Sequence, residues 1–419
     1  MQLVERHIIS KNHSLFKEID SVAFLSKNLY NKANYIIRDM FITTSDLKKL
    51  EVVERAKWIR CYDLQKNLKS EKEFVALPAK VSQQVLKTLD KNWVAFFAAN
   101  KDYNKSPHKY EGQPKLPKYK HKTKGRNLLT YTIQSISKVE LRQGIVALSK
   151  TNIRIKTKQI NINQVRIVPR GTHYVIEIIY TKNIKINENL DKKKIAGIDL
   201  GLNNLATVTS NQSSVKPLLI NGRALKSINQ FYNKKRAKLQ SFVGDKSSRK
   251  LKILTHKRNM KVNNYLHNAS RIIVNHLVEN CVGTLVIGKN KKWKTNINIG
   301  RKTNQNFVNI PHARFIEMLE YKCKLIGIEV KITEESYTSK CSFIDFEAVC
   351  KHETYLGKRT KRGLFVSKDK TKINADCNGS GNIIRKAFST AFNGYGIEGV
   401  VVHPILINLS ESYPYKKVA

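Results

Sequence analysis

Two acidic side chains, far apart in the sequence, have the residue type and the setting to bind a divalent metal ion together. Asp199 ends the apolar run Ile195–Ile198 and precedes a turn at Gly201–Asn204 that joins two short strands, because Gly and Asn tolerate positive φ at low cost. Asp376 opens a helical pattern near the C-terminus. A carboxylate at a strand end and another at a helix start often assemble such a site. For Asp199 alone, a turn or capping role is the alternative interpretation.

The segments that must position these acids alternate between strand and helix. The β-branched run Gly283–Gly288 predicts a buried strand, because it does not alternate with polar residues. A helix at Pro311–Gly327 is followed by a third main strand at Glu329–Glu334. Before them, basic residues recur at helical spacing over Asn221–Lys261, and a second helix follows at Tyr265–Glu279. The alternation predicts an α/β core with a central sheet, which we assign to residues 191–392.

The N-terminal half divides into an all-α and an all-β part. Residues 11–104 carry apolar residues at helical spacing and predict a helical lobe. Residues 105–190 contain a basic segment and then short strand patterns that predict a small barrel or sandwich. A first strand at Gln2–Ile9, within residues 1–10, is expected to join it. Residues 393–419 form a C-terminal tail, whose apolar stretches are candidates to pack on the core: Val400–Val402 and Ile405–Ile407.

The charge of the chain predicts its class of partner. The 419 residues include 77 Lys and Arg against 32 Asp and Glu, a formal net charge of +45, which exceeds what solubility requires and predicts a polyanion. No long apolar run indicates a membrane span, and Met1–Arg6 lacks the apolar core of a signal peptide. We therefore expect nucleic acid and no membrane. Six scattered cysteines form no disulfide framework, which favours a reducing cytoplasm.

Candidate nucleic-acid contacts gather in two basic segments. Within Lys101–Arg126, cations interleave with tyrosines, a composition that suits a phosphate backbone and stacked bases. Its candidates are Lys115, Lys118, Tyr119, Lys120, Lys122, Lys124 and Arg126. The second segment, Gly357–Gly363, is a candidate phosphate-gripping loop and offers Lys358, Arg359 and Arg362. For each segment a solvated linker or turn is the alternative.

The motifs around the two acids, Gly197–Gly201 and Asn374–Ser380, are joined by others in a fixed order. These are Gly112–Lys120, Ser149–Asn152, Val286–Asn290, Asn304–Pro311 and Glu335–Lys340. Together they resemble the TnpB family of transposon-associated, RNA-guided nucleases of the IS200/IS605 OrfB kind, which are relatives of type V CRISPR effectors. The similarity runs from about residue 20 to about residue 390.

This resemblance implies a fold and an activity. The fold would be an RNase H-like RuvC nuclease domain preceded by a helical recognition lobe and a wedge β-barrel. The activity would be Mg²⁺-dependent DNA cleavage, directed by a noncoding guide RNA that pairs with a double-stranded DNA target beside a short flanking motif. Two Mg²⁺ ions held by carboxylates would stabilise the attacking and leaving oxygens.

The chain departs from the family at the third acid. The family commonly has Glu at the end of its second core strand, where this sequence has Gly288. The next strand ends with Glu334 and Glu335, and we hypothesise that one of them replaces the missing ligand, as in a subset of the family. Neighbouring strand residues point to opposite faces, and we favour Glu335. The predicted metal ligands are Asp199, Glu335 and Asp376, with Glu334 as the alternative catalytic acid; two surface acids are the other interpretation.

Zinc is not expected. Many relatives carry a four-cysteine ribbon between the third strand and the last Asp. The corresponding insert here, at about residues 340–372, offers Cys341, Cys350 and His352 without a CxxC pair, whereas structural zinc sites use four closely spaced ligands.

Three hypotheses for the function follow. The first is the RNA-guided endonuclease. The second is an RNA-guided DNA-binding protein with weakened or absent cleavage, which Gly288 favours. The third is a transposase or transposase accessory protein, although no tyrosine- or serine-recombinase constellation stands out.

Overall fold

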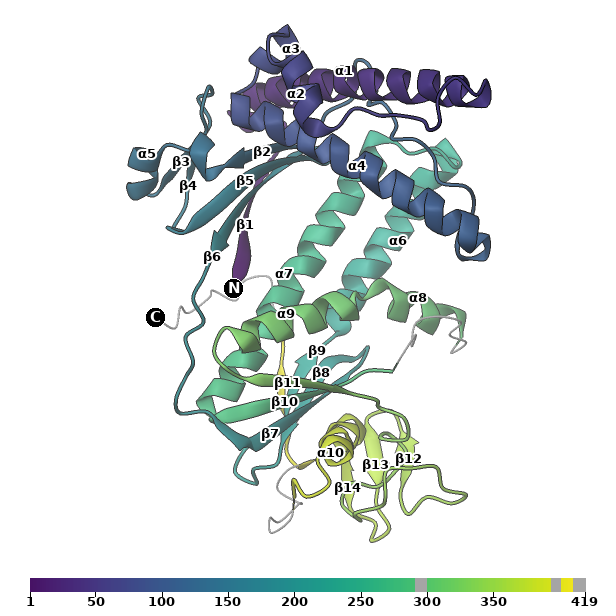
Figure 1. The fold of residues 1–419 in the computed structure, drawn as a ribbon. Helices are drawn as coiled ribbons and strands as arrows, with labels where there is room; N and C mark the ends of the chain where they lie inside the picture. The colour runs from purple at the N-terminus through teal and green to yellow at the C-terminus, as the bar shows by residue number, and fades with distance from the viewer. Residues whose placement is uncertain (291–299, 393–400, 410–419) are drawn as a thin grey trace. The chain divides into compact units, whose positions relative to one another are not determined.

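The computed structural model describes residues 1–290, 300–392 and 401–409. Its internal contacts divide the chain into two compact units, Met1–Lys182 and Asn183–Ala419, and Figure 1 labels their elements. None of the helices in the described ranges is long and apolar enough to cross a membrane.

Unit 1 contains a layer of helices. The long helices α1 (Phe16–Lys49) and α4 (Ala79–Lys105) pack together, and the short helices α2 (Cys61–Leu68) and α3 (Lys72–Val75) lie between them in the sequence. Apolar residues three and four positions apart form one stripe on each long helix. The fully buried Trp93 of α4 lies at the centre of this packing. Helices thus occupy most of the segment for which a helical lobe is predicted.

Four strands of unit 1 form an antiparallel sheet. Their order is β1 (Gln2–Ile9), β6 (Tyr174–Thr181), β5 (Ile162–Pro169) and β2 (Leu129–Thr132). A separate pair is formed by β3 (Ile145–Ala147) and β4 (Arg154–Lys156), while α5 (Lys138–Arg142) and the 3₁₀ turns η1 (Pro107–Lys109) and η2 (Ile133–Ser135) lie in connections. The first strand is confirmed. Helices and sheet share one apolar core, and the closed barrel stays a prediction.

Unit 2 is built on a six-stranded sheet ordered β11-β10-β7-β8-β9-β15. Strands β7 (Asp191–Leu200), β8 (Asn204–Ser210) and β9 (Leu218–Asn221) run antiparallel in series. On the other side of β7, β10 (Val282–Gly288) and β11 (Glu329–Thr333) are parallel to it, and β15 (Ile405–Ile407) is parallel to β9. The predicted hairpin, the central sheet and the buried strand β10 are confirmed. Ile405–Ile407 pairs with β9, but Ile405 and Leu406 are 45% and 50% exposed, so their packing on the core stays a prediction. Val400 lies outside the described residues.

Helices cover both faces of this sheet. Alternate residues of β7 face opposite sides of the sheet. Ile198 packs on the side covered by α7 (Arg249–Glu279) and α9 (His312–Lys324). Helix α8 (Arg301–Asn309) precedes α9 in the sequence. Ile195 faces α10 (Ala375–Ala387) and a small three-stranded sheet. The strands of this small sheet are β12 (Lys358–Lys361), β13 (Leu364–Val366) and β14 (Lys372–Asn374). Figure 1 shows α10 and α9 on opposite sides of the large sheet.

The helical break predicted between Lys261 and Tyr265 is wrong. Helix α6 (Arg223–Val243) ends at Gly244, and α7 then continues without interruption from Arg249 to Glu279. Gly244 has a φ of +55°, a conformation that Gly adopts without steric cost. The Ser248 side chain accepts a hydrogen bond from the Leu251 N–H and caps α7. The basic composition of this stretch concealed the break.

Helix α10 lies directly on the backbone of β7 at Gly197. A Cβ atom at this position would lie 2.6 Å from the Ser380 carbonyl oxygen and 2.7 Å from Cγ1 of Ile384. The Ser380 hydroxyl donates to the Gly197 carbonyl oxygen at 2.8 Å and accepts from the Thr209 hydroxyl at 3.0 Å. Only Gly permits this approach, because any side chain would push the helix off the strand.

We predict that Gly197→Ala loosens α10. Overpacking a buried contact costs roughly 1–3 kcal/mol, so amide hydrogen exchange across α10, followed by mass spectrometry, should accelerate by about tenfold. Gly112→Ala is the matched control, since nothing lies within 4 Å of a Cβ at Gly112, and its exchange should equal that of the wild type. Unchanged α10 exchange in Gly197→Ala would contradict the packing described here.

Candidate active site

Asp199 is the second-last residue of β7, and its side chain lies on the face of the sheet that α10 covers. A Cβ atom at Gly379 of that helix would lie 3.1 Å from Asp199 Oδ2, so the carboxylate packs against the helix backbone. The strand fixes its position through pairing with Thr207 of β8. His312, at the start of α9, donates from Nε2 to the Gly201 carbonyl oxygen at 3.2 Å and ties down the turn that follows.

Asp376 is the second residue of α10. The Asn374 side chain caps the helix by accepting from the N–H groups of Asp376 and Cys377, at 2.9 and 3.2 Å. The two carboxylate oxygens of Asp376 have separate partners. Asn204 Nδ2 donates to Oδ2 at 2.8 Å, and Arg359 Nη2 lies 3.3 Å from Oδ1. Asn204 comes from the hairpin that follows Asp199, so it links the two motifs.

Glu335 lies beside Gly288, the last residue of β10. A Cβ atom built on Gly288 would lie 3.0 Å from Glu335 Oε2 and 2.6 Å from Ile383 Cδ1 of α10. The parallel register pairs Gly288 with Thr333, which brings the end of β11 alongside the end of β10. The carboxylate of Glu335 therefore reaches the region into which a longer side chain at position 288 would point.

Asn290 holds Glu335 in place. Its Oδ1 accepts from the Glu335 N–H at 3.0 Å, and its Nδ2 lies 3.4 Å from Glu335 Oε1. Glu335 Oε2 is buried and has no hydrogen-bond partner among the described residues. A buried carboxylate oxygen without a donor is costly, and it is therefore the atom of this group best suited to an added ligand.

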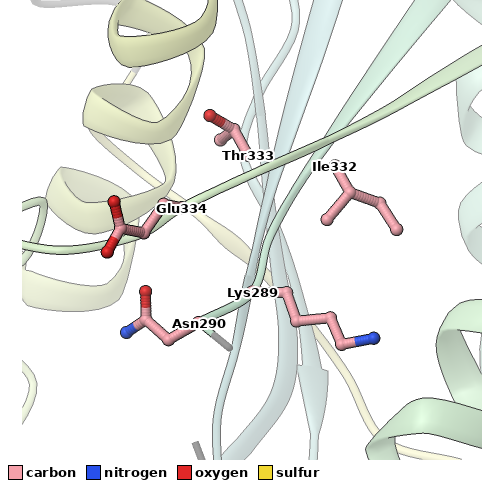
Figure 2. A pocket seen from close by; sticks show the side chains of 5 residues that line it. All are labelled: Lys289, Asn290, Ile332, Thr333 and Glu334. Carbon is pink, nitrogen blue, oxygen red and sulfur yellow. The ribbon is translucent and has the colours of Figure 1, made fainter. Parts of the chain in front are cut away.

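Glu334 has a different environment from Glu335. It is exposed and lines a pocket on the edge of the sheet with Lys289, Asn290, Ile332 and Thr333, as Figure 2 shows. In the figure the Glu334 carboxylate points away from the Lys289 side chain. Glu334 is thus the more exposed of the two acids, although Asn290 borders both of them.

Two of the acids have raised pKa values. Burial, followed by the nearby charges of Asp376 and Glu335, raises the pKa of Asp199 to about 8, and Arg359 acts in the opposite direction. Burial raises the pKa of Glu335 to about 7. Like charges near a poorly solvated carboxyl group favour its neutral form. A nearby cation would therefore favour the ionised forms of Asp199 and Glu335.

The residue types fit a hard divalent cation, because all the donor atoms are carboxylate oxygens. In this geometry, however, no group of three His, Cys, Asp or Glu side chains among residues 1–290, 300–392 and 401–409 is arranged to hold a metal ion. Arg359 lies against one of the Asp376 oxygens instead. The chain thus brings the acids together without completing a ligand set.

A buried carboxylate organises the insert that precedes Asp376. Glu347 accepts from the Ser342 N–H at 2.6 Å and from the Leu356 N–H at 2.9 Å. Two amides of α10, Asn378 and Asn382, donate to the Cys341 carbonyl oxygen at 2.9 and 2.8 Å. Of the zinc-ligand candidates, Cys350 Sγ lies 3.4 Å from His352 Nε2, and Cys341 is buried nearby with its thiol on the Cys350 carbonyl. Polar side chains thus hold this loop together.

The candidate nucleic-acid residues differ in exposure. Most of these residues have exposed side chains: Lys115, Lys118, Tyr119, Lys122, Lys124, Lys358, Arg359 and Arg362. Lys120 is half-buried, and Arg126 is half-buried and paired with Asp20. The second basic segment is strand β12 and its turn, where Gly363 has a φ of +83°, rather than an irregular loop.

Sequence reasoning missed the polar residues that support the acids. Asn204 and Asn290 hold Asp376 and Glu335, and Gly379 makes room for Asp199. Each lies within a motif named above: Asn204 begins β8, Asn290 lies two residues after β10, and Gly379 is the fifth residue of α10. Their place in these motifs was the available signal, but an amide at a turn has many ordinary roles.

Two segments of the chain match known family models. Residues 174–294 match the family OrfB_IS605, described as a probable transposase. Residues 312–383 match the Cas12f1-like TNB domain. The two matched ranges contain Asp199 and Asp376 respectively, and the second also contains Glu335.

A curated relative spans almost the whole chain. The TnpB-like protein ORF457 of Acidianus two-tailed virus is 24% identical over 446 aligned residues, covering 96% of this chain and 88% of that protein. With the two domain matches, this relative shows that the chain is similar to TnpB-like proteins.

Solved structures of two similar effectors cover most of the chain. The structure of a Cas12f1–sgRNA–target DNA complex covers 91% of this chain and 98% of its own, with 15% identity and a TM-score of 0.37. The mini-RNA-guided endonuclease CRISPR-Cas_phi3 covers 92% of each chain, with 10% identity and a TM-score of 0.37. At TM-scores below 0.5 these likenesses define neither the fold nor the activity of this chain.

The raised pKa of Asp199 predicts how stability depends on pH. Between its ordinary value of 3.8 and about 8, the folded chain holds a proton that the unfolded chain has released. The free energy of unfolding of unit 2 should therefore fall as pH rises across this window. Asp199→Asn should remove part of this slope and be more stable than the wild type at pH 8 by roughly 1–3 kcal/mol.

Urea unfolding in EDTA, at a series of pH values, measures this difference. The exposed Asp369, for which the structure gives no ion pair, supplies the control variant Asp369→Asn, which should keep the wild-type slope. Identical slopes for the wild type and Asp199→Asn would contradict the description of this site.

Proposed function

We propose that this chain is an RNA-guided, Mg²⁺-dependent DNA endonuclease with an RNase H-like RuvC nuclease domain. The observation that supports the proposal is the placement of three acids near the ends of β7 and β11 and in the first turn of α10: Asp199, Glu335 and Asp376. The raised pKa of Asp199 has Asp376 and Glu335 among its causes, which supports their proximity. The similarity to TnpB-like proteins agrees with this activity.

The three carboxylates have distinct parts in this proposal. Asp199, on the rigid end of a central strand, and Asp376, on the capped first turn of α10, would hold two Mg²⁺ ions together with Glu335. When bound, these ions would activate a water molecule and stabilise the leaving oxygen of the phosphodiester. Asn290 orients Glu335 through two contacts, and Arg359 adds a cation at the rim of the site.

Glu335, rather than Glu334, is proposed as the third ligand. Its Oε2 is buried and lacks a hydrogen-bond donor in the described part of the chain, and it occupies the space beside Gly288. Glu334 is exposed and lines the edge pocket. The relocation keeps a carboxylate at the site although the second core strand ends in Gly.

The partners proposed are a guide RNA and a double-stranded DNA target. The net charge of +45 supports large phosphate contacts. Unit 1, with its helices and sheet, would contain the recognition lobe and wedge domain predicted for residues 11–104 and 105–190, and the exposed basic residues of both units would contact the phosphate backbones. The relative captured as a Cas12f1–sgRNA–target DNA complex binds this pair of partners.

A second function is favoured by one specific observation. Arg359 occupies Asp376 Oδ1, and the described residues contain no completed metal-ligand group. An RNA-guided DNA-binding protein with weakened cleavage would have these features, and the same experiment distinguishes the two functions.

The test uses protein co-expressed with RNA from its own locus. The purified complex is incubated with guide-matched DNA beside a randomised flank, with Mg²⁺ or with EDTA. We expect cuts only with Mg²⁺, and a fall in rate of about 100-fold or more in Asp199→Ala and in Glu335→Gln. Glu334→Gln is the matched control and should cut at close to the wild-type rate.

Each other outcome has a defined meaning. If Glu335→Gln cuts as fast as wild type while Glu334→Gln is slow, the ligand assignment is reversed. If neither variant differs from wild type, no relocated ligand exists. Guide-dependent binding without cuts in the wild type would establish the binding protein instead of the nuclease.

A further inference from the structure

The basic segment before β2 runs along helix α1 in a fixed position. We call residues 115–126 the basic strap. This stretch contains six Lys or Arg and no Asp or Glu. Its chain follows α1 in the opposite direction, and side chains of that helix contact its backbone at three points along its length.

Polar side chains on one face of α1 make these contacts. Asn34 Nδ2 donates to the Pro117 carbonyl oxygen at 3.0 Å, and Lys27 Nζ donates to the Lys122 carbonyl oxygen at 2.7 Å. Between them, Asn31 makes two hydrogen bonds to Lys120. Its Nδ2 donates to the carbonyl oxygen at 2.8 Å, and its Oδ1 accepts from the backbone N–H at 2.8 Å.

The spacing of these residues explains the geometry. Positions 27, 31 and 34 are four and three residues apart, which places them on one face of a helix. From Lys27 to Asn34 along α1, the strap residues that are contacted run in the opposite direction, from Lys122 through Lys120 to Pro117. The Asn31 amide pairs with the strap as a neighbouring β-strand would. We call Lys27, Asn31 and Asn34 the α1 ladder.

The ladder is built into the core of unit 1. Asn34 is fully buried and its Oδ1 also accepts from the Trp93 indole N–H at 3.0 Å. Lys27 is only 3% exposed, and its ammonium lies 3.8 Å from the centre of the Phe24 ring. Burying a cation for a backbone carbonyl and an aromatic face is costly. A flexible, solvated linker would not require this.

The strap is also anchored at its C-terminal end. Arg126 forms a two-point ion pair with Asp20 of α1, at 2.9 and 2.6 Å, and Asp20 accepts a further hydrogen bond from the Tyr174 hydroxyl. The pair holds the pKa of Asp20 below its usual range. Arg126 therefore serves as an internal anchor, which distinguishes it from the lysines that precede it.

Fixing the backbone leaves a row of cations facing solvent. Lys118, Lys122 and Lys124 are exposed. Tyr119 is 44% exposed, and the Arg38 guanidinium lies 5.0 Å from the centre of its ring. An aromatic face beside ordered cations matches the combination of base stacking and phosphate contacts used for nucleic-acid strands.

We propose that the α1 ladder positions the basic strap as a preformed binding surface for the phosphate backbone of nucleic acid. The inference rests on the proposed function only in that the partner is nucleic acid, and it does not involve the carboxylate site. Ordering a backbone segment costs conformational entropy. The ladder orders the strap when the chain folds. Nucleic-acid binding therefore does not have to order it and loses less conformational entropy.

The experiment measures binding by the full chain, in EDTA so that cleavage is absent. Probes are a fluorescent single-stranded RNA and a DNA duplex of mixed sequence, each titrated over a series of salt concentrations. Asn31→Ala removes two hydrogen bonds and no charge. We expect its affinity to fall by about three- to tenfold with an unchanged salt slope, because the phosphate contacts remain but the strap must be ordered.

Two further variants complete the design. The triple variant replaces three strap lysines with Gln: Lys118→Gln, Lys122→Gln and Lys124→Gln. It should lower the steepness with which the binding constant falls with salt concentration by about 2 on the single-stranded probe, at about 0.7 per lost phosphate contact. Asn28→Ala is the matched control, since Asn28 lies on α1 three residues from Asn31 and no contact with the strap involves it; it should bind like the wild type. Hydrogen exchange of the strap amides should accelerate in Asn31→Ala and not in Asn28→Ala.

The outcomes separate the two proposals. If the triple lysine variant keeps the wild-type affinity and slope on both probes, the strap is not a binding surface and the inference is overturned. If Asn31→Ala exchanges faster but binds as tightly as wild type, the ladder has no positioning role in binding. Loss on RNA alone or on duplex DNA alone supports the inference and identifies the nucleic acid. An Asp199→Ala protein that binds normally but does not cut leaves the strap result independent of the nuclease.

Discussion

The contact between α10 and the backbone of β7 determines how the rest of unit 2 is arranged. Gly197 allows the helix to touch the strand, and the buried Ser380 hydroxyl connects the Gly197 carbonyl to Thr209. Because the helix axis is fixed at this point, its first turn can only lie beside the end of β7. Two carboxyl groups that repel one another are thereby held close by apolar packing and hydrogen bonds several residues away.

In this arrangement, packing holds acidic groups close together although their charges repel. A site built for its own stability would place a neutral or basic residue near Asp199, since partly buried like charges disfavour ionisation. The chain instead keeps Asp376 and Glu335 near Asp199 and compensates in part with Arg359 and two amides. Sites whose groups are arranged for a ligand often lower the stability of the unliganded protein. The acids of unit 2 have this property.

The sequence predicted the strands and helices that carry the acids, because buried strands and amphipathic helices have distinct periods. It also identified Asp199, Asp376 and the pair Glu334–Glu335 as the residues to examine. It did not show which acid of the pair approaches Gly288, since that depends on the parallel register of β10 with β11. The α6–α7 boundary was misplaced because a Gly in a basic stretch looked like part of a helix. The contacts of Asn31 with Lys120 join residues 89 positions apart, and a single sequence contains no signal for such a pairing.

The space beside Gly288 has a consequence for related sequences. A Cβ atom there would already lie 3.0 Å from Glu335 Oε2 and closer still to Ile383, so a Glu at position 288 and Glu335 would compete for the same volume. Glu at both positions should therefore be rare in one chain, and the residues at positions 288, 335 and 383 should vary together among related sequences.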